Sequence, residues 1–261
     1  MAKIMEAGLR GYMYHFFVEP SQIDVGNRRV IITGNDVNHI VNVLRIRPGE
    51  EIAVSNGVDG KEYRCEVGSF DREQVECVLR FIKEDGVELP GKLRLFQALP
   101  KADKMELIIQ KAVELGVHEI IPVAAGRCVV KLDAKKEAAK LARWNAIAEA
   151  AAKQSRRAIV PKVGAVMRFA DAVKEAAKAD VKMIPYELAA DMACTRELIG
   201  SIRAGAEVSV MIGPEGGFEE EEIAQAKAAG IVPITLGRRI LRTETAGFTV
   251  LAWLMYHLEP V

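Results

Sequence analysis

MIGPEGGFEEEEIAQAKAAGIVPITLGRRILRTETA, residues 211–246, contains two strands, each followed by a glycine loop and a helix. An apolar strand over residues 208–212 stops at Gly213, and a glycine-rich loop leads into a helix that starts at four glutamates, residues 219–222. Carboxylates favour a helix start because the exposed backbone N–H groups there carry partial positive charge. Gly230 ends this helix, residues 231–236 are predicted to form the next strand, and a second glycine turn follows at Gly237.

Two glycine loops at the ends of successive strands predict a binding site. In an open α/β sheet, ligands bind at the edge where the strands end, and glycines let the backbone come close to a ligand. GPEGGF lacks the lysine and hydroxyl of a phosphate-binding loop, and the dinucleotide motif GxGxxG is absent. One such loop alone is more often a tight turn. The pair, with Arg238, Arg239 and Arg242 in the second loop, favours a neutral, backbone-lined pocket suited to an adenine edge and an amino acid tail.

Beyond residue 92 the pattern alternates between strands and helices. Strands are expected at residues 93–99, 117–123, 181–186, 208–212 and 232–236, and helices at residues 103–115, 135–155 and from the second glycine loop to about residue 258. This succession predicts an α/β domain with a mostly parallel sheet and helices on both faces.

The first third of the chain has a different, shorter rhythm. Strands are expected at residues 14–18, 28–33, 51–56, 61–67 and 74–82, separated by turn residues. Residues 35–44 instead have helical spacing behind Asn35, which is expected to cap the helix. We therefore expect a small β-barrel with one helix, followed by a linker within EDGVELPG, residues 84–91.

Six segments of the chain, in this order, resemble one family. They are HIVNVLRIRPGE (39–50), KADKMELIIQKAVELGVHEIIP (101–122), RCVVKLD (127–133), RWNAIAEAAAKQSRRAIVP (143–161), IGPEGGF (212–218) and LGRRILRTETA (236–246). These segments are similar to the SPOUT-class methyltransferases, and more narrowly to the family that methylates N3 of a uridine in small-subunit (16S) ribosomal RNA.

The resemblance implies a domain organisation. Residues 13–84 would form a PUA-like RNA-binding β-barrel, 85–91 the linker, and 92–261 a SPOUT domain whose C-terminal strands and helices form a deep trefoil knot. Members of the family usually begin near MYHFFVEP, so residues 1–12 would be an N-terminal extension. SPOUT relatives complete their site across a subunit interface, which implies a homodimer.

The resemblance also implies the site. S-adenosylmethionine would be held mainly by backbone atoms and apolar packing from the two glycine loops and the end of the preceding strand: Tyr186, Glu187, Ile212, Gly213, Pro214, Glu215, Gly216, Gly217, Leu236, Gly237, Ile240, Leu241 and Arg242. Uridine N3 becomes anionic when it loses its proton, and Arg242 is expected to stabilise that charge. Glu244 is the other catalytic candidate, either as the base or as a residue that orients Arg242.

The RNA contacts are expected from cations and one amide. KQSRR, residues 153–157, follows a long alanine-rich helix and could hold a phosphate or a base edge. Arg156 has no role assigned, because family members often have glycine there. The substrate-binding candidates are Arg45, Lys101, Lys104, Arg127, Gln154 and Arg157, and for most of these cations a solvated surface position is about equally expected. The resemblance implies that the partner is 16S ribosomal RNA within the assembled small ribosomal subunit.

Composition sets the remaining bounds. Net charge is zero, and half of the 261 residues are hydrophobic, enough for one large or two modest domains. The four cysteines form no CxxC pair, and neither they nor the four histidines are at metal-ligand spacing, so no metal is expected. Neither a secretory signal nor a membrane-spanning stretch is evident, which favours a cytoplasmic protein.

Two alternatives remain open. One is another SPOUT methylation, at a ribose 2′-O or guanine N1. The other is an RNA-binding assembly factor without catalysis, although intact GPEGG and LRTETA segments argue against it.

Overall fold

The computed structural model describes residues 13–84, 86–189 and 191–259, so the extension expected at residues 1–12 lies outside the described residues. The chain forms two compact units. The first comprises the described residues up to Glu88 together with Arg156–Ile159, and the second comprises Leu89–Ser155 and the residues from Val160 onward. The short segment after the long helix therefore packs with the first unit.

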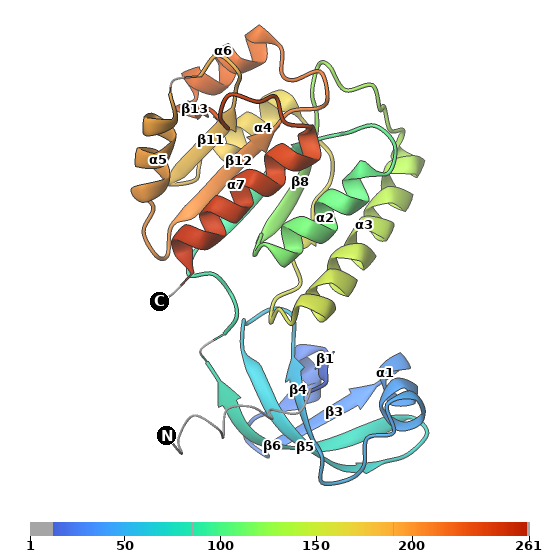
Figure 1. Cartoon of the computed structure of the whole chain (residues 1–261). Coiled ribbons are helices and arrows are strands. Elements are labelled where there is room, and N and C mark those ends of the chain that lie inside the picture. Colours follow the sequence, from blue (N-terminus) through green and yellow to red (C-terminus); the bar gives the residue numbers. More distant parts are fainter. Residues whose placement is uncertain (1–12, 85, 190, 260–261) are drawn as a thin grey trace. The chain divides into compact units, whose positions relative to one another are not determined.

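The first unit is built around a six-stranded sheet. Its elements are β1 (His15–Phe17), a 3-10 helix (Pro20–Gln22), β2 (Ile23–Asp24), β3 (Arg29–Thr33), α1 (Asn35–Asn38), a π-helical turn (His39–Val43), β4 (Glu51–Ser55), β5 (Glu62–Phe70) and β6 (Gln74–Lys83). The strand order is β1-β4-β5-β6-β3-β2, and only β1 and β4 pair in parallel. The sheet curls around its own core, as expected for the small barrel (Figure 1).

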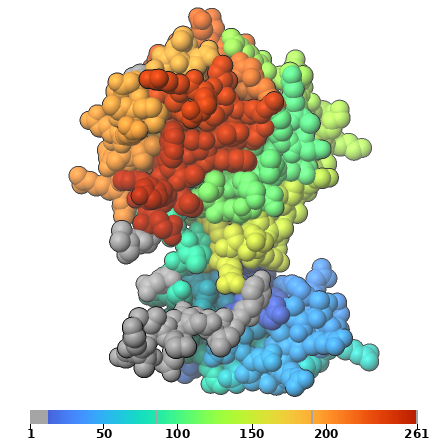
Figure 2. Space-filling view, in the orientation of Figure 1, coloured from blue at the N-terminus to red at the C-terminus, as the bar shows by residue number. Residues whose placement is uncertain are grey.

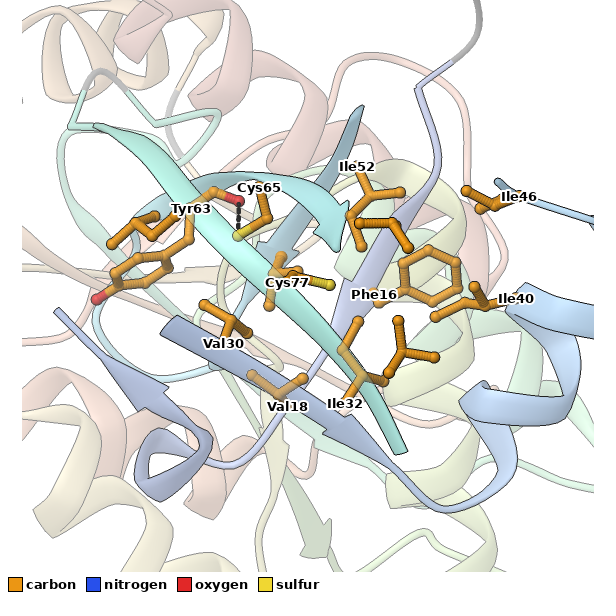
Figure 3. Packing of buried hydrophobic residues seen from close by; sticks show 14 of the residues in the cluster. Phe16, Val18, Val30, Ile32, Ile40, Ile46, Ile52, Tyr63, Cys65 and Cys77 are labelled. Carbon is orange, nitrogen blue, oxygen red and sulfur yellow. Dashed lines mark hydrogen bonds between the residues drawn. The ribbon is translucent and has the colours of Figure 1, made fainter. Parts of the chain in front are cut away.

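The core of the first unit comes from alternate positions of these strands. In β5 and β6 every second residue at the start of the strand is buried, because successive side chains point to opposite faces. Figure 3 shows Phe16, Ile40 and Ile52 packed on one side of this core and Cys65 and Cys77 near its centre. Both thiols are buried by apolar neighbours, and this burial raises the pKa of each to about 12.

The helix of the first unit differs in one detail from the sequence prediction. Gly34, with φ of 75°, is the N-cap, and the helix begins at Asn35, whose side chain makes no cap hydrogen bond. The expected Asn35 cap is therefore wrong. Glycine is favoured at this position because the chain enters the helix through positive φ.

The second unit is a seven-stranded parallel sheet between two helical layers. Its elements are β7 (Lys92–Ala98), α2 (Lys104–Glu114), β8 (Glu119–Ala124), α3 (Ala134–Ser155), β9 (Lys162–Val163), β10 (Met167–Arg168), α4 (Phe169–Ala176), β11 (Val181–Pro185), α5 (Met192–Gly200), β12 (Glu207–Ile212), α6 (Glu220–Ala228), β13 (Val232–Ile234) and α7 (Thr243–Leu258). The strand order is β10-β8-β7-β12-β11-β13, with β9 beside β8.

Helices cover both faces of this sheet, so a site is expected where the strands end. Helices α2, α3, α5 and α7 cover one face, and α4 and α6 cover the other (Figure 1). The central strands β7, β8 and β12 are almost wholly buried, as expected for a parallel sheet covered on both faces. Because every strand pair is parallel, all carboxyl ends lie at one edge.

The α/β class and the main strands and helices agree with the sequence prediction. Two helices, α4 and α5, and the short strands β2, β9 and β10 were not predicted. The strand expected at residues 231–236 is shorter, Val232–Ile234, because Thr235 leaves the ladder and pairs with a buried side chain of α5, Thr195.

Candidate functional site

Four of the loops at the carboxyl edge of the second unit follow strands that are neighbours in the sheet. They follow β7 (residues 99–103), β11 (186–191, of which residue 190 is not described), β12 (213–219) and β13 (235–242). We call residues 213–217 the first glycine loop and residues 235–242 the second glycine loop. Strands β7, β12, β11 and β13 are consecutive neighbours in the sheet, so these loops are neighbours as well. Strand order therefore brings the predicted loops together.

The first glycine loop is shaped by close backbone contacts. A Cβ at Gly213 would lie 3.2 Å from the Phe218 ring and 3.3 Å from the backbone of Gly217, so a side chain there would require these neighbours to move by a few tenths of an ångström. Gly217 has φ of 69° and donates its N–H to the Pro214 carbonyl at 2.9 Å. Helix α6 begins at Glu220, within the run of glutamates that predicted a helix start, and Glu219 caps it in a capping box with Glu222.

The second glycine loop lies beside the loop after β11. Tyr186 N–H donates to the Ile234 carbonyl at 2.9 Å, so the residue that follows β11 continues the pairing with β13. Gly237 has φ of 102° and donates its N–H to the Thr235 hydroxyl at 3.2 Å. Ile240 is 91% exposed, so its side chain extends out of the loop, and Arg242 is exposed as the N-cap of α7.

A cluster of charges links these loops. Lys104 Nζ lies 2.9 Å from Glu215 Oε1 and 3.6 Å from Glu244 Oε2. Glu215 also accepts the Lys101 backbone N–H at 3.1 Å. Burial acts to raise the pKa of Glu215, but the hydrogen bonds from Lys104 and the backbone outweigh it, and its pKa is lowered; the same hydrogen bond raises the pKa of Lys104. Glu244 thus faces Lys104, and no Arg242–Glu244 ion pair is found among the described residues.

The other predicted substrate contacts are distributed over both units. Lys101 is exposed in the loop after β7, and Arg127, after β8, donates to the Gly216 carbonyl at 2.9 Å, so both lie at the same edge. Gln154 is exposed near the end of the 22-residue helix α3, which starts at this edge and runs back across the sheet for about 33 Å. It therefore lies at the opposite edge.

Arg45 and Arg157 belong to the first unit. Arg45 is exposed just after the π-helical turn, with φ of 56°. Arg157 is only 4% exposed, and its guanidinium forms an ion pair with Glu88, whose carboxylate also accepts the Ala158 and Ile159 N–H groups. This ion pair anchors residues 156–159 within the first unit and leaves the Arg157 side chain little exposed surface for the RNA contact that the sequence predicted.

The comparisons with known proteins cover nearly the whole chain. Residues 87–255 match the model of the RNA methyltransferase domain family, and residues 32–80 match that of the RNA methyltransferase PUA domain. The chain is 37% identical over 251 residues to ribosomal RNA small subunit methyltransferase E of Bacillus subtilis, covering 95% of this chain and 98% of the relative. The chain belongs to this RNA methyltransferase family.

Solved structures of this RNA methyltransferase family agree in fold. A ribosomal RNA small subunit methyltransferase E from Neisseria gonorrhoeae, bound to S-adenosyl methionine, is 32% identical, with a TM-score of 0.78 over 94% of this chain and 98% of the relative. A protein from Legionella pneumophila, whose structure was solved in complex with the same cofactor, is 31% identical, with the same TM-score and the same coverage of both chains. The two-domain α/β fold with a PUA-like unit is thereby shown.

The site of this family member includes two residues that the sequence prediction missed. Gln97 is completely buried near the end of β7, and its Nε2 donates to the Thr243 hydroxyl at 3.0 Å. Thr243, 5% exposed at the start of α7, donates in turn to the Gly213 carbonyl at 2.6 Å. A polar residue inside the apolar strand LRLFQAL was the available signal, since buried polar groups require partners.

The described residues contain neither a group of side chains suited to a metal ion nor a membrane-spanning helix. No group of three or more His, Cys, Asp or Glu side chains in the described residues could hold a metal ion. No helix in residues 13–259, leaving out residues 85 and 190, is long and apolar enough to cross a bilayer.

Proposed function

We propose that this chain transfers a methyl group from S-adenosylmethionine to N3 of a uridine in small-subunit (16S) ribosomal RNA. The observation that carries the proposal is the pair of glycine loops at one sheet edge, with cations beside them, in a chain of this RNA methyltransferase family. The cofactor is drawn from the two relatives whose structures hold it, and the ribosomal substrate from the name of the Bacillus subtilis relative.

The glycine loops fit the donor. A Cβ at Gly213 would make close contacts with Phe218 and Gly217, and Gly217 and Gly237 have positive φ, which favours glycine. Without side chains at these positions, main-chain N–H and C=O groups can approach an adenine and a methionine tail. In this proposal the donor is held by residues of the two loops and of the loop after β11: Tyr186, Glu187, Ile212, Gly213, Pro214, Glu215, Gly216, Gly217, Leu236, Gly237, Ile240, Leu241 and Arg242.

The reaction needs alignment and charge stabilisation. S-adenosylmethionine supplies the methyl group from a sulfonium, which leaves as a neutral thioether. Uridine N3 must lose its proton to accept that methyl group, and the ring is anionic at that point. Arg242, exposed at the N-cap of α7, would stabilise the anion, because a fixed guanidinium favours the deprotonated ring. Glu244, in the first turn of α7, would take the proton or orient the site.

The RNA would reach the site over a basic rim. Lys101 and Arg127 lie at the carboxyl edge and are exposed, so their cations can face phosphates. Arg45 would contribute from the PUA-like unit. These contacts would hold the small subunit, the proposed partner, while the two glycine loops hold the donor.

We also propose that the protein is a knotted homodimer. After the edge strand β13, the chain returns past the loops of β11 and β12 to the middle of the sheet. There α7 packs against β12 and α2. A return of this kind is compatible with a trefoil knot. In Figure 2, α7 and the second glycine loop, in red, form the middle of one face beside α2, in green. Tyr256 on α7 is 87% exposed and Leu107 on α2 is 42% exposed, which favours a partner there.

The experiment that tests the function uses Arg242→Ala. Turnover on small subunits that lack the modification should fall about 100-fold or more. The affinity for S-adenosylmethionine measured by calorimetry should stay close to wild type, because the proposed contact of Arg242 with the donor is made by its backbone, which the substitution keeps. The matched control is Arg203→Ala, an exposed arginine in the turn before β12, at the opposite edge of the sheet. Equal turnover in the two variants would remove Arg242 from the stabilising role.

Nucleoside mass spectrometry of the product separates the alternatives. Methyl on uridine N3 supports the proposal, whereas methyl on a ribose 2′-O or on guanine N1 would assign another reaction to the same site. Cofactor binding without any transfer would instead favour an RNA-binding assembly factor.

A further inference from the structure

Lys104 occupies an unusual position for a surface lysine. It is the first residue of α2, directly after the loop of β7, and its side chain is 27% exposed. Its ammonium lies between one carboxylate from the first glycine loop, Glu215, and one from the start of α7, Glu244. One cation therefore connects segments that follow three different strands, β7, β12 and β13.

The two carboxylates depend on this cation. Glu215 and Glu244 have side chains that are 24% and 17% exposed, so water screens their charges only in part. Glu244 Oε2 is buried, and no hydrogen-bond partner is found for it in the described part of the chain. The Lys104 ammonium, 3.6 Å away, supplies the opposite charge. Without Lys104, two carboxylates within 3.6 Å of one point would repel each other.

The same geometry argues against a phosphate contact. An ammonium has three N–H donors, and here one is bonded to Glu215 while the charge is shared with Glu244. A phosphate that reached Lys104 would also approach both carboxylates, and like-charge repulsion would oppose it. The RNA contact expected for Lys104 from the sequence is therefore not the role that its surroundings favour.

We propose that Lys104 is a positioning residue of the methyl-transfer site. Its ammonium joins Glu215 to Glu244 and thereby fixes the first glycine loop to the start of α7, which carries Arg242. This inference rests on the proposed function for its effect on turnover. Its structural part, the tie between the two loops, stands on the ion pairs alone.

The test replaces Lys104 by Met, which keeps a long side chain without the charge. At saturating RNA and cofactor, we expect the turnover of Lys104→Met to fall at least tenfold. RNA affinity and the slope of log affinity against log salt concentration should stay at the wild-type values. A phosphate contact would give the opposite pattern: weaker RNA binding, a slope reduced by about 0.7–0.9, and normal turnover at saturation. That pattern would overturn the proposal.

Two further variants sharpen the result. Lys104→Arg keeps a cation and should recover most of the lost turnover, whereas a role in packing alone would not be rescued by charge. Lys111→Met is the matched control, because Lys111 lies on the same helix and pairs with Glu114 away from the site. Its turnover should equal that of the wild type, and a tenfold loss there would show that any lysine removed from α2 has this effect.

A readout without RNA separates this inference from the proposed function. Amide hydrogen exchange should become faster in Lys104→Met at Gly217, whose N–H is bonded to Pro214, and at Ala246, whose N–H is bonded to Arg242. If the wild-type protein methylates no RNA, the proposed function fails, and the exchange rates still decide the positioning role. Unchanged exchange at both amides, with unchanged turnover, would refute it.

Discussion

The hydroxyl of Thr243 is predicted to stabilise the second unit through two buried hydrogen bonds. It accepts from Gln97 Nε2 and donates to the Gly213 carbonyl, and so connects the end of β7, the first glycine loop and the start of α7. In Thr243→Val, an N–H of the completely buried Gln97 loses its partner, which costs about 1–3 kcal/mol, and the carbonyl of Gly213, a half-buried residue, adds about 1 kcal/mol. The expected loss of unfolding free energy is about 2–4 kcal/mol.

Chemical denaturation followed by tryptophan fluorescence measures this loss. Both tryptophans of the chain, Trp144 in α3 and Trp253 in α7, belong to the second unit, so the signal reports on the unit that contains Thr243. Hydrogen-bond loss and altered packing can be separated with Thr243→Ser. This variant keeps the hydroxyl and removes one methyl group, and it should lose only about 1 kcal/mol.

Thr249→Val is the matched control for Thr243→Val. Thr249 lies on the same helix, and its hydroxyl donates to the Thr245 carbonyl within that helix, near solvent. Its removal should change the unfolding free energy by less than about 0.5 kcal/mol. The reasoning is refuted if Thr243→Val and Thr249→Val have the same stability.

Two more predictions concern the first unit and the thiols. Burial lowers the pKa of His15 in the folded protein below 6.5. As the pH falls, the unfolded chain therefore binds a proton at His15 before the folded protein does, and the first unit should lose stability as the pH falls from 6.5 toward the depressed pKa. Unfolding followed by circular dichroism should show a smaller loss of stability between pH 7 and pH 5 for His15→Gln than for the wild type. If the stability of the two proteins depends on pH in the same way, His15 is not the cause. A thiol reagent at pH 8 should modify exposed Cys194 rapidly and leave Cys65 and Cys77 intact until unfolding, because burial raises the pKa of both to about 12. Peptide mass spectrometry measures the labelling, and a label on Cys65 or Cys77 in the folded protein would contradict this prediction.

How well each helix could be predicted from the sequence depended on whether neighbouring residues or distant contacts define it. Helix α6 could be predicted at its first turn, because Glu219 and Glu222 cap it within four residues of each other. Helix α4 was missed although its buried residues are spaced at i, i+3, i+4 and i+7, so the pattern was sufficient to find it. Helix α5 is different, since Thr195 is its one fully buried residue, and its place is defined by the contact with Thr235.

The candidate site was predictable in its loops and not in its contacts. The two glycine loops are visible in the sequence because glycine is required where the backbone turns or must be approached closely. The ion pairs of Lys104, by contrast, join positions 111 residues or more apart along the chain. Only the order of β7, β12 and β13 in the sheet could bring those positions together.

Local patterns were sufficient to predict the α/β class, the division into a barrel-like first part and an alternating second part, and the two glycine loops. Hydrophobic periodicity and glycine turns are properties of neighbouring residues, so they can be recognised without a structure. The burial of Arg157 against Glu88, the contact of Gln97 with Thr243 and the position of Lys104 between two carboxylates became visible only in the folded chain. Those pairings depend on which strands are neighbours, and no short-range pattern contains that information.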